Sequence, residues 1–147
     1  MALEVRPEDV KRFVRGVLAS LRLLDNYRVR LLGIDFKEEA GLIERVLHSF
    51  YELTEREVVR FADVFDVSTE SVRLLRKVVD GVKSYIDGLR AECERLRGER
   101  RRKCFLEWQA LMTFFLELKA VIDNVIIFLG VVADSALMLE RMAVRKR

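Results

Sequence analysis

The chain is poor in the residues that interrupt helices. Its 147 residues include one proline and seven glycines, too few for the many turns of an all-β fold. Half of the residues are hydrophobic and about a third are charged, which is typical of a globular chain and excludes intrinsic disorder. The length suffices for one domain with its own core. We therefore expect a single all-α domain.

Side-chain amides are almost absent, and arginine outnumbers lysine. The only amides are Asn26, Asn124 and Gln109. Abundant charge with few amides resembles the composition of hyperthermophile proteins, although GC-rich coding also produces an arginine bias. We expect the source to be a thermophilic archaeon or bacterium, or a virus of one.

Long uncharged stretches are also absent. The longest uncharged run extends from Asn124 to Ala133, whereas a helix that spans a bilayer needs about 20 apolar residues. Charged residues at positions 4, 6, 8 and 9 interrupt any leader-like apolar segment. We therefore expect no membrane partner and a cytoplasmic location, or a place in the virion if the chain is viral.

The chain has few of the residues that enzymes use for chemistry. His48 is the single histidine, and no glycine-rich phosphate loop or nucleophile motif is present. Two cysteines and one distant histidine fall short of the four ligands of a structural zinc site. We therefore expect a non-enzymatic protein with no catalytic residue, no metal, no cofactor and no small-molecule substrate.

The chain does contain two apolar seams that mirror each other. One seam is Val72, Leu75, Val79, Val82, Ile86, Leu89 and Cys93, and the other is Cys104, Trp108, Leu111, Phe115, Leu118, Ile122 and Val125. Alternating steps of three and four residues are typical of helices that pack knobs-into-holes. When the first residue of one seam is paired with the last of the other, and so on inward, the two residue numbers of every pair sum to 197. A common sum means that one helix advances along the chain as its partner goes back, so the helices run antiparallel. The seams predict a long helical hairpin over about 69–97 and 100–143, with its turn near Gly98.

Three shorter helices are expected before the hairpin. They are predicted over about 7–32, 35–52 and 54–65. Thr54 and Glu57 form a capping-box pair that would open the third of these helices. Ser68 would then cap the first helix of the hairpin. The domain would thus consist of N-terminal helices at 1–67 and the hairpin at 68–147.

The segment 54–77 has the residue spacing of a helix-turn-helix. Ala62 allows two helices to cross closely, and a tight turn is predicted at 66–68. Val72 and Leu75 would then lock the crossing. The segment resembles the helix-turn-helix DNA-binding unit of bacterial and archaeal regulators, which implies that the second helix enters a major groove. A plain helical corner would need the same small and β-branched residues.

The helix-turn-helix resemblance implies a set of contacts with DNA. Base contacts are implied for Thr69, Glu70, Arg73 and Lys77, and phosphate contacts for Arg60 and Arg76. By this resemblance Thr69, Glu70, Arg73, Arg76 and Lys77 follow the predicted turn on the second helix, whereas Arg60 precedes the turn on the first helix.

Positive charge is concentrated at two places. Residues 90–103 carry seven basic and three acidic side chains, and residues 141–147 carry four basic ones. Arg100, Arg101 and Arg102 lie at the predicted hairpin tip, where guanidinium groups can bind phosphates. A solvated, charged turn is the alternative interpretation of the tip.

Cys93 and Cys104 are the innermost pair of the two seams. Their Cα atoms are expected within about 7 Å, close enough for a disulfide. They are either two buried thiols or a disulfide that closes the hairpin, and intracellular disulfides do occur in hyperthermophiles.

Nucleic-acid binding is the function that these features favour, with duplex DNA as the expected partner and a transcriptional regulator as the expected role. The alternative is a structural or assembly protein: a capsid or nucleoprotein subunit of an archaeal virus, or a small ribonucleoprotein subunit. Such a protein would self-associate through the last helix, as a homodimer or a higher homo-oligomer. Beyond its seam, that helix offers Phe114, Ile126, Phe128, Val131 and Met138.

Overall fold

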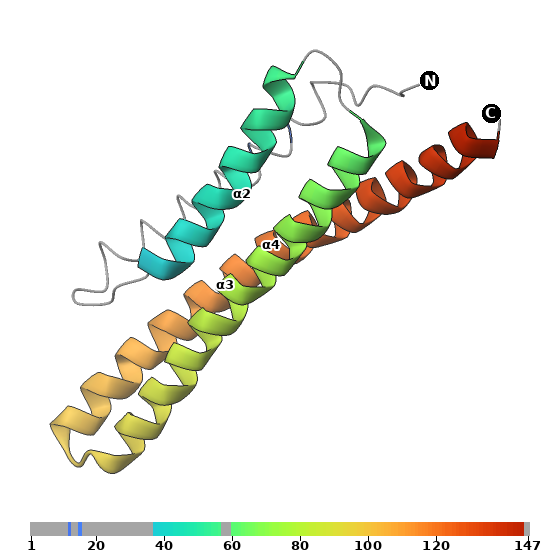
Figure 1. Ribbon diagram of the computed structural model, residues 1–147. Helices are drawn as coiled ribbons and strands as arrows, with labels where there is room; N and C mark the ends of the chain where they lie inside the picture. Colours follow the sequence, from blue (N-terminus) through green and yellow to red (C-terminus); the bar gives the residue numbers. More distant parts are fainter. Residues whose placement is uncertain (1–11, 13–14, 16–36, 57–59, 146–147) are drawn as a thin grey trace.

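Every described element is an α-helix. The computed structural model describes residues 12, 15, 37–56 and 60–145. The elements are α2 (Lys37–Glu55), α3 (Phe61–Arg95) and α4 (Glu99–Arg145), with no strand among the described residues (Figure 1). The all-α class is confirmed for this part of the chain. The helix predicted over 7–32 lies outside the described residues, apart from the helical positions 12 and 15.

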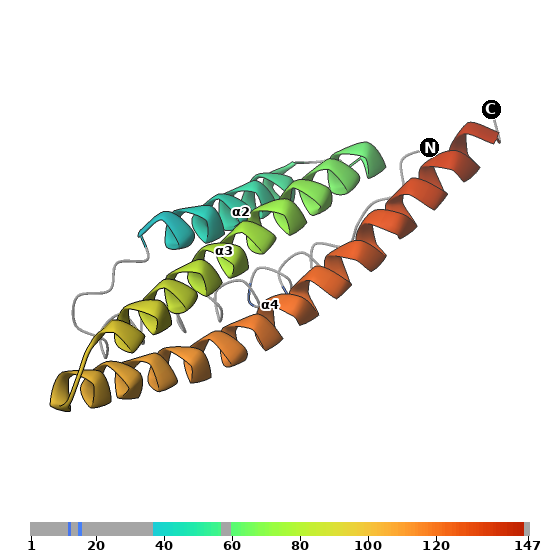
Figure 2. The same cartoon turned by 90° about the horizontal axis from the view of Figure 1, so that it is seen from below.

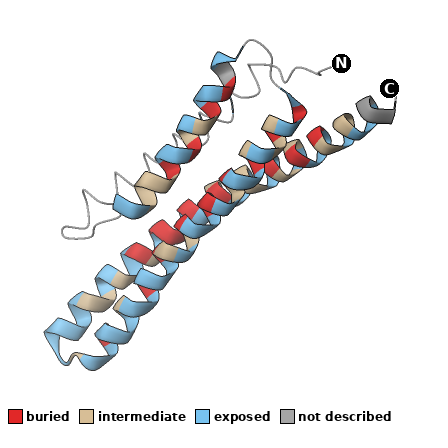
Figure 3. Cartoon of the chain, viewed as in Figure 1, coloured by how far each residue is buried: buried red, intermediate tan, exposed pale blue. Residues whose placement is uncertain are grey.

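α3 is the central helix, because α2 and α4 both pack against it (Figure 2). Buried apolar side chains from all three helices form one core. The core includes Ile43 and Leu53 of α2, Leu75 and Val82 of α3, and Leu118 and Ile122 of α4. Burial is greatest along the middle of the helices, and the end of the hairpin is mainly exposed (Figure 3). The hairpin end is therefore the most accessible part of α3 and α4.

The predicted antiparallel hairpin is present. α3 ends at Arg95 and α4 begins at Glu99, with Gly98 in the left-handed conformation at φ 67°, which glycine adopts without a steric penalty. A disulfide joins Cys93 and Cys104, whose Cα atoms lie 5.4 Å apart. That distance is inside the expected 7 Å, and the bond holds together the innermost pair of the two seams.

The turn predicted at 66–68 is wrong, because α3 continues through it without a break. The seam extends back from Val72 with the same spacing, as Phe61, Phe65 and Ser68. Phe61 and Phe65 pack in one cluster with Ala136 and Val132 of α4. Phe61 with Ala136 and Phe65 with Val132 have the same sum of residue numbers as the seven predicted pairs, so the two seams extend by two further layers of contacts.

Ser68 explains why sequence reasoning placed a turn there. Its side chain is 0% exposed, and its hydroxyl oxygen has no hydrogen-bond partner among the described residues. Serine is a preferred N-cap residue, so a serine among apolar seam positions suggests the start of a helix. No glycine or proline lies beside Ser68 to force a turn. Packing against α4 therefore outweighs the local signal, and the division between 1–67 and 68–147 falls inside a helix.

The predicted start of a helix at Thr54 is also wrong. Thr54 lies inside α2, which extends to Glu55 instead of ending near residue 52. The next helix starts at Phe61, after Arg60 as an N-cap that makes no side-chain capping bond. Two of the five predicted helices, over 54–65 and 69–97, are thus replaced by the single helix α3, which starts at Phe61.

Candidate nucleic-acid interface

The side chains implied by the helix-turn-helix resemblance are exposed, but they lie along a straight helix. Thr69, Glu70, Arg73, Arg76 and Lys77 are all exposed on α3. The Thr69 hydroxyl donates to the backbone oxygens of Phe65 and Asp66, at 3.0 and 3.1 Å. Because the turn before these residues is absent, they do not start a separate recognition helix.

Arg73 is paired within its own helix. Its Nε donates to Oε2 of Glu70 at 2.9 Å, and its Nη2 donates to Oε1 of the same carboxylate. The hydrogen bond from Arg73 lowers the pKa of Glu70, and the bond to Glu70 raises the pKa of Arg73. A base or phosphate would have to compete with this carboxylate for the guanidinium.

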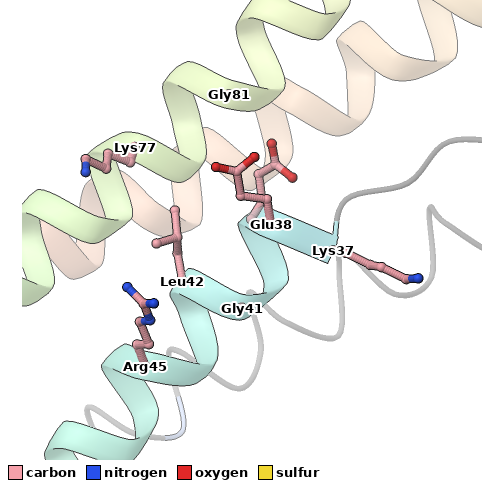
Figure 4. A pocket seen from close by; sticks show the side chains of 8 residues that line it. Lys37, Glu38, Gly41, Leu42, Arg45, Lys77 and Gly81 are labelled. Atoms are coloured by element: carbon pink, nitrogen blue, oxygen red, sulfur yellow. The ribbon is translucent and has the colours of Figure 1, made fainter.

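Lys77 borders an open pocket between α2 and α3 (Figure 4). The pocket has a volume of about 670 Å³, and Arg45 lines it from α2 together with the carboxylates of Glu38 and Glu39. A Cβ atom added at Gly81 would lie 2.7 Å from Oε1 of Glu39, so this glycine leaves room for the carboxylate. With Lys37, three basic side chains and two carboxylates line the pocket, so its net charge is small and it has no clear preference for an anion or a cation.

α2 limits access to this part of α3. Glu70 and Leu74 line a second open pocket with His48 and Arg45 of α2, so α2 lies alongside the helix that was expected to enter a major groove. The segment 54–77 also carries five basic and five acidic side chains. Neither access nor net charge favours DNA at this surface.

The hairpin tip, defined as residues 95–103, has a different electrostatic character. It contains six basic side chains and one carboxylate. The basic side chains are Arg95, Arg97, Arg100, Arg101, Arg102 and Lys103, and all are exposed. Among the described residues, none of these six forms an ion pair within 4.0 Å. The tip therefore presents an uncompensated positive charge to solvent.

The position of these cations in the fold is unusual for a surface that only stabilises the protein. Arg100, Arg101 and Arg102 lie in the first turn of α4, which begins at Glu99. The N-terminus of a helix carries a partial positive charge, so cations there are unfavourable for the helix and anions are favourable. The field of the helix thus adds to the field of the side chains, and both attract an anion.

A rigid base supports the tip. The disulfide lies directly beneath it and ties α3 to α4. The guanidinium of Arg90 lies 5.1 Å from the centre of the Trp108 ring, and the guanidinium of Arg101 lies 5.6 Å from that of Phe105. The disulfide and the Arg90–Trp108 contact join α3 to α4, whereas the Arg101–Phe105 contact lies within α4. The backbone that carries the cations is therefore tied across the two helix ends.

The proposed contact residues do not come together in one site. Arg60 lies at the start of α3, Arg76 is midway along it, and Arg100 to Arg102 lie beyond its far end. At about 1.5 Å per residue, Arg73 and the tip are separated by about 35–40 Å. The tip and the outer face of α3 are therefore two separate candidate surfaces.

Catalytic and metal-binding groups do not assemble in the described part of the chain. His48 is exposed and its Nε2 lies 3.0 Å from Glu52 Oε1, one helical turn away. No group of three or more His, Cys, Asp or Glu side chains suitable for a metal occurs among the described residues. The structure thus presents charged and apolar surfaces as its candidate functional features.

The apolar residues predicted for self-association divide into two groups. Phe114 is 0% exposed, and Ile126 is partly buried and packs against the core, so both contribute to packing within the chain. Val131 and Met138 are exposed, and Phe128 is 39% exposed. The prediction also missed Leu116 and Ile127, which are 59% and 66% exposed. Leu116, Ile127, Val131 and Met138 are separated by 11, 4 and 7 residues, a spacing that places them on one side of a helix. This spacing could have identified Leu116 and Ile127 from the sequence.

By length and composition, α4 is apolar enough to cross a membrane. An 18-residue stretch has a mean hydropathy of 1.9, and 22% of that stretch is buried. The expectation from the sequence counted only uncharged runs, and so it did not foresee this property. A helix in a protein core or interface has the same composition. Placing an aspartate at the centre of a bilayer costs about 2.5–3.5 kcal/mol of insertion free energy. Asp123 and Asp134 are two such exposed groups on α4.

Comparison of the chain with protein-family models, with curated proteins and with solved structures finds no match in any of the three.

Proposed function

We propose that this protein binds nucleic acid through the phosphate backbone, with the hairpin tip as its contact surface. The supporting observation is the cluster of six exposed cations beside one carboxylate. Because half of them crowd a helix N-terminus, where cations are unfavourable, folding alone gives no reason for the cluster. Phosphate is the anion that arginine side chains bind bidentately.

The proposed binding mode recognises charge and not base sequence. A protruding turn contacts phosphates along the groove edges, and phosphate contacts carry no sequence information. Duplex DNA carries one negative charge per about 1.7 Å of helix axis, so we expect it to bind more tightly than single-stranded DNA or RNA. Binding should weaken steeply as salt increases, because each contact releases a counterion.

The test is a fluorescence-anisotropy titration of labelled duplexes at two or more salt concentrations. Replacing Arg100, Arg101 and Arg102 together by alanine should weaken all duplexes alike. If all three contact phosphates, the slope of log K against log salt should flatten by about 2.7, at about 0.9 per contact. A triple variant of equal charge, with alanine at Arg45, Lys83 and Lys119, removes exposed cations from α2, α3 and α4 and is the matched control.

The two triple variants separate a specific tip from a general effect of net charge. If both lose the same affinity, only the overall charge of the protein matters and the tip has no special role. If the wild-type protein binds neither DNA nor RNA at low salt, nucleic-acid binding is excluded altogether.

DNA reading by the outer face of α3 is a finer proposal with its own test. The variant Arg73→Ala should weaken a preferred duplex by about 1–3 kcal/mol and relax its sequence preference if that arginine contacts a base. If Arg73 contacts no base, Arg73→Ala removes only its pairing with Glu70, and the affinity for DNA should change little. A silent Arg73→Ala combined with a strong effect of the tip variant would favour a nucleoprotein role over a sequence-specific regulator.

Assembly is the second candidate function. It is favoured by one observation, the exposed apolar side of α4, where Leu116, Ile127, Val131 and Met138 are each about 60% exposed. A structural subunit that polymerises or dimerises through this side would need no tip contacts with nucleic acid. The oligomeric state at micromolar concentration tests this candidate directly.

A further inference from the structure

One side of α4 is apolar, exposed and regularly spaced. We call it the outer stripe, and it consists of Leu116, Ala120, Ile127, Val131, Met138 and Met142. Its steps alternate between four and seven residues, so the pattern repeats every 11 residues. Eleven residues make three helical turns, which keeps the stripe on one line along a nearly straight helix. The stripe lies on the opposite side of α4 from Leu118 and Ile122, the residues that face α3.

The outer stripe exposes large apolar side chains along most of α4. Its five larger side chains are between 52% and 66% exposed. Leu106 and Phe128 are exposed as well and add to the apolar surface of α4. A standard interface takes roughly 800 Å² from each partner. The stripe is made of three apolar pairs, and the exposed polar residues Asp123, Asn124, Asp134 and Ser135 flank its line between the pairs. Exposed large apolar residues gathered on one side of a helix mark an interaction surface.

We infer that the outer stripe binds the outer stripe of a second copy of this chain, with the two α4 helices antiparallel. The stripe reads the same in both directions about Leu129. Leu116 and Met142 are equally far from that residue, and so are Ile127 and Val131. A two-fold axis at the level of Leu129, on the side of α4 opposite this buried residue, therefore places the stripe residues of one copy opposite those of the other, as an isologous interface requires.

Charge determines the orientation. A parallel pair would hold two hairpin tips side by side, each with six basic side chains and one carboxylate, and like charges at short range repel. The antiparallel pair places the tips at opposite ends. Gly98 lies 31 residues from Leu129, so the two tips are about 90 Å apart at 1.5 Å per residue.

A second copy fits the stripe better than a lipid surface does. Glu117, Asp123 and Asp134 are exposed along the edges of the stripe. In a helix pair these carboxylates remain in water at the rim, whereas a membrane would bury them or bring them to anionic headgroups. The surface is thus apolar along its centre and charged at its rim, as protein interfaces are.

The first test is the mass of the protein in solution by light scattering over a dilution series. The wild-type protein should have twice the 17.2 kDa mass of the chain. Ile127→Lys should raise the dissociation constant of the dimer at least tenfold without changing the circular dichroism spectrum, because this side chain is 66% exposed. Ser84→Lys, at an exposed position of α3, is the matched control and should leave the dimer intact.

The second test fixes the orientation by cysteine trapping. Leu116→Cys alone and Met142→Cys alone should give no covalent dimer under mild oxidation, because each lies far from its own copy. An equimolar mixture of the two variants should give one. The two native cysteines are already joined to each other, so they do not compete.

Three results would overturn the inference. A wild-type protein that is monomeric at about 100 μM lacks even the weak affinity expected of a small interface. Crosslinking of either single-cysteine variant with itself would indicate a parallel pair. Flotation of the monomer with phospholipid vesicles would show that the stripe faces lipid instead of a second copy.

Discussion

Replacing Leu118 should cost far more stability than replacing Leu116, although the two residues are neighbours on α4. Leu118 is 0% exposed in the contact with α3, and Leu116 is 59% exposed on the opposite side. Leu118→Ala deletes buried carbons and leaves a cavity, which costs about 3 kcal/mol, within the 2–5 kcal/mol range of such changes. Leu116→Ala should cost less than about 1 kcal/mol in the monomer. Leu118→Asp should cost more than either, because its carboxylate would be buried without a partner.

Thermal unfolding followed by circular dichroism measures the difference. For a chain of this length, 1 kcal/mol corresponds to a change in Tm of about 2–4 °C. Leu118→Ala should therefore lower Tm by about 6–12 °C and Leu116→Ala by less than about 4 °C. The measurement belongs at low micromolar concentration, where self-association contributes least. Equal losses for the two alanine variants would show that α4 does not present Leu118 to α3, and the reasoning from the seams would fail.

Three further predictions concern the hairpin and its helices. Reducing the disulfide should destabilise the protein by about 3 kcal/mol, the loop-closure entropy of about 12 residues, and unfolding with and without reductant measures this. Gly88→Ala should stabilise α3 by up to about 1 kcal/mol, because an added Cβ there meets nothing within 4 Å. Gly81→Ala should stabilise it less, because the Glu39 side chain must move to make room. Equal stabilisation by the two variants in thermal unfolding would contradict the packing of α2 against α3. The Glu70 carboxyl should titrate below its usual pKa of 4.5, so any stability from its pairing with Arg73 is present at neutral pH and is lost as the pH falls through the lowered pKa; an NMR titration in which Arg73→Ala leaves that pKa unchanged would refute the assignment of cause.

The hairpin could be predicted from the sequence because its information is redundant. Seven residue pairs with one common sum fix the direction, the register and the turn together, and a single ambiguous residue does not alter the result. The turn itself needs a residue that adopts positive φ, and Gly98 supplies it. Long helices with strict periodicity are the elements that sequence patterns identify most reliably.

The region before the hairpin could not be predicted as well, because its signals are single residues. Ser68 and Thr54 each match the preference of a helix N-cap, yet both lie inside helices. The start of α3 has no side-chain capping bond at Arg60, so no local signal marks it. Phe61 and Ala136 have the same sum of residue numbers as the seven predicted pairs, and this would have indicated the longer helix. Ser68 interrupts the apolar pattern before that pair is reached.

Combined, the basic tip and the outer stripe would make the protein a connector with two binding ends. Two tips about 90 Å apart and directed away from each other cannot grip one short duplex, so each would bind a separate segment of nucleic acid. The wild-type protein should then retain a free labelled duplex on beads that carry a second duplex. Ile127→Lys should bind a single duplex as the wild type does at low concentration but retain no second one, and the triple tip variant should dimerise without binding either. Undiminished retention by Ile127→Lys would show that bridging does not depend on the α4 pair, while the tip could still bind phosphate.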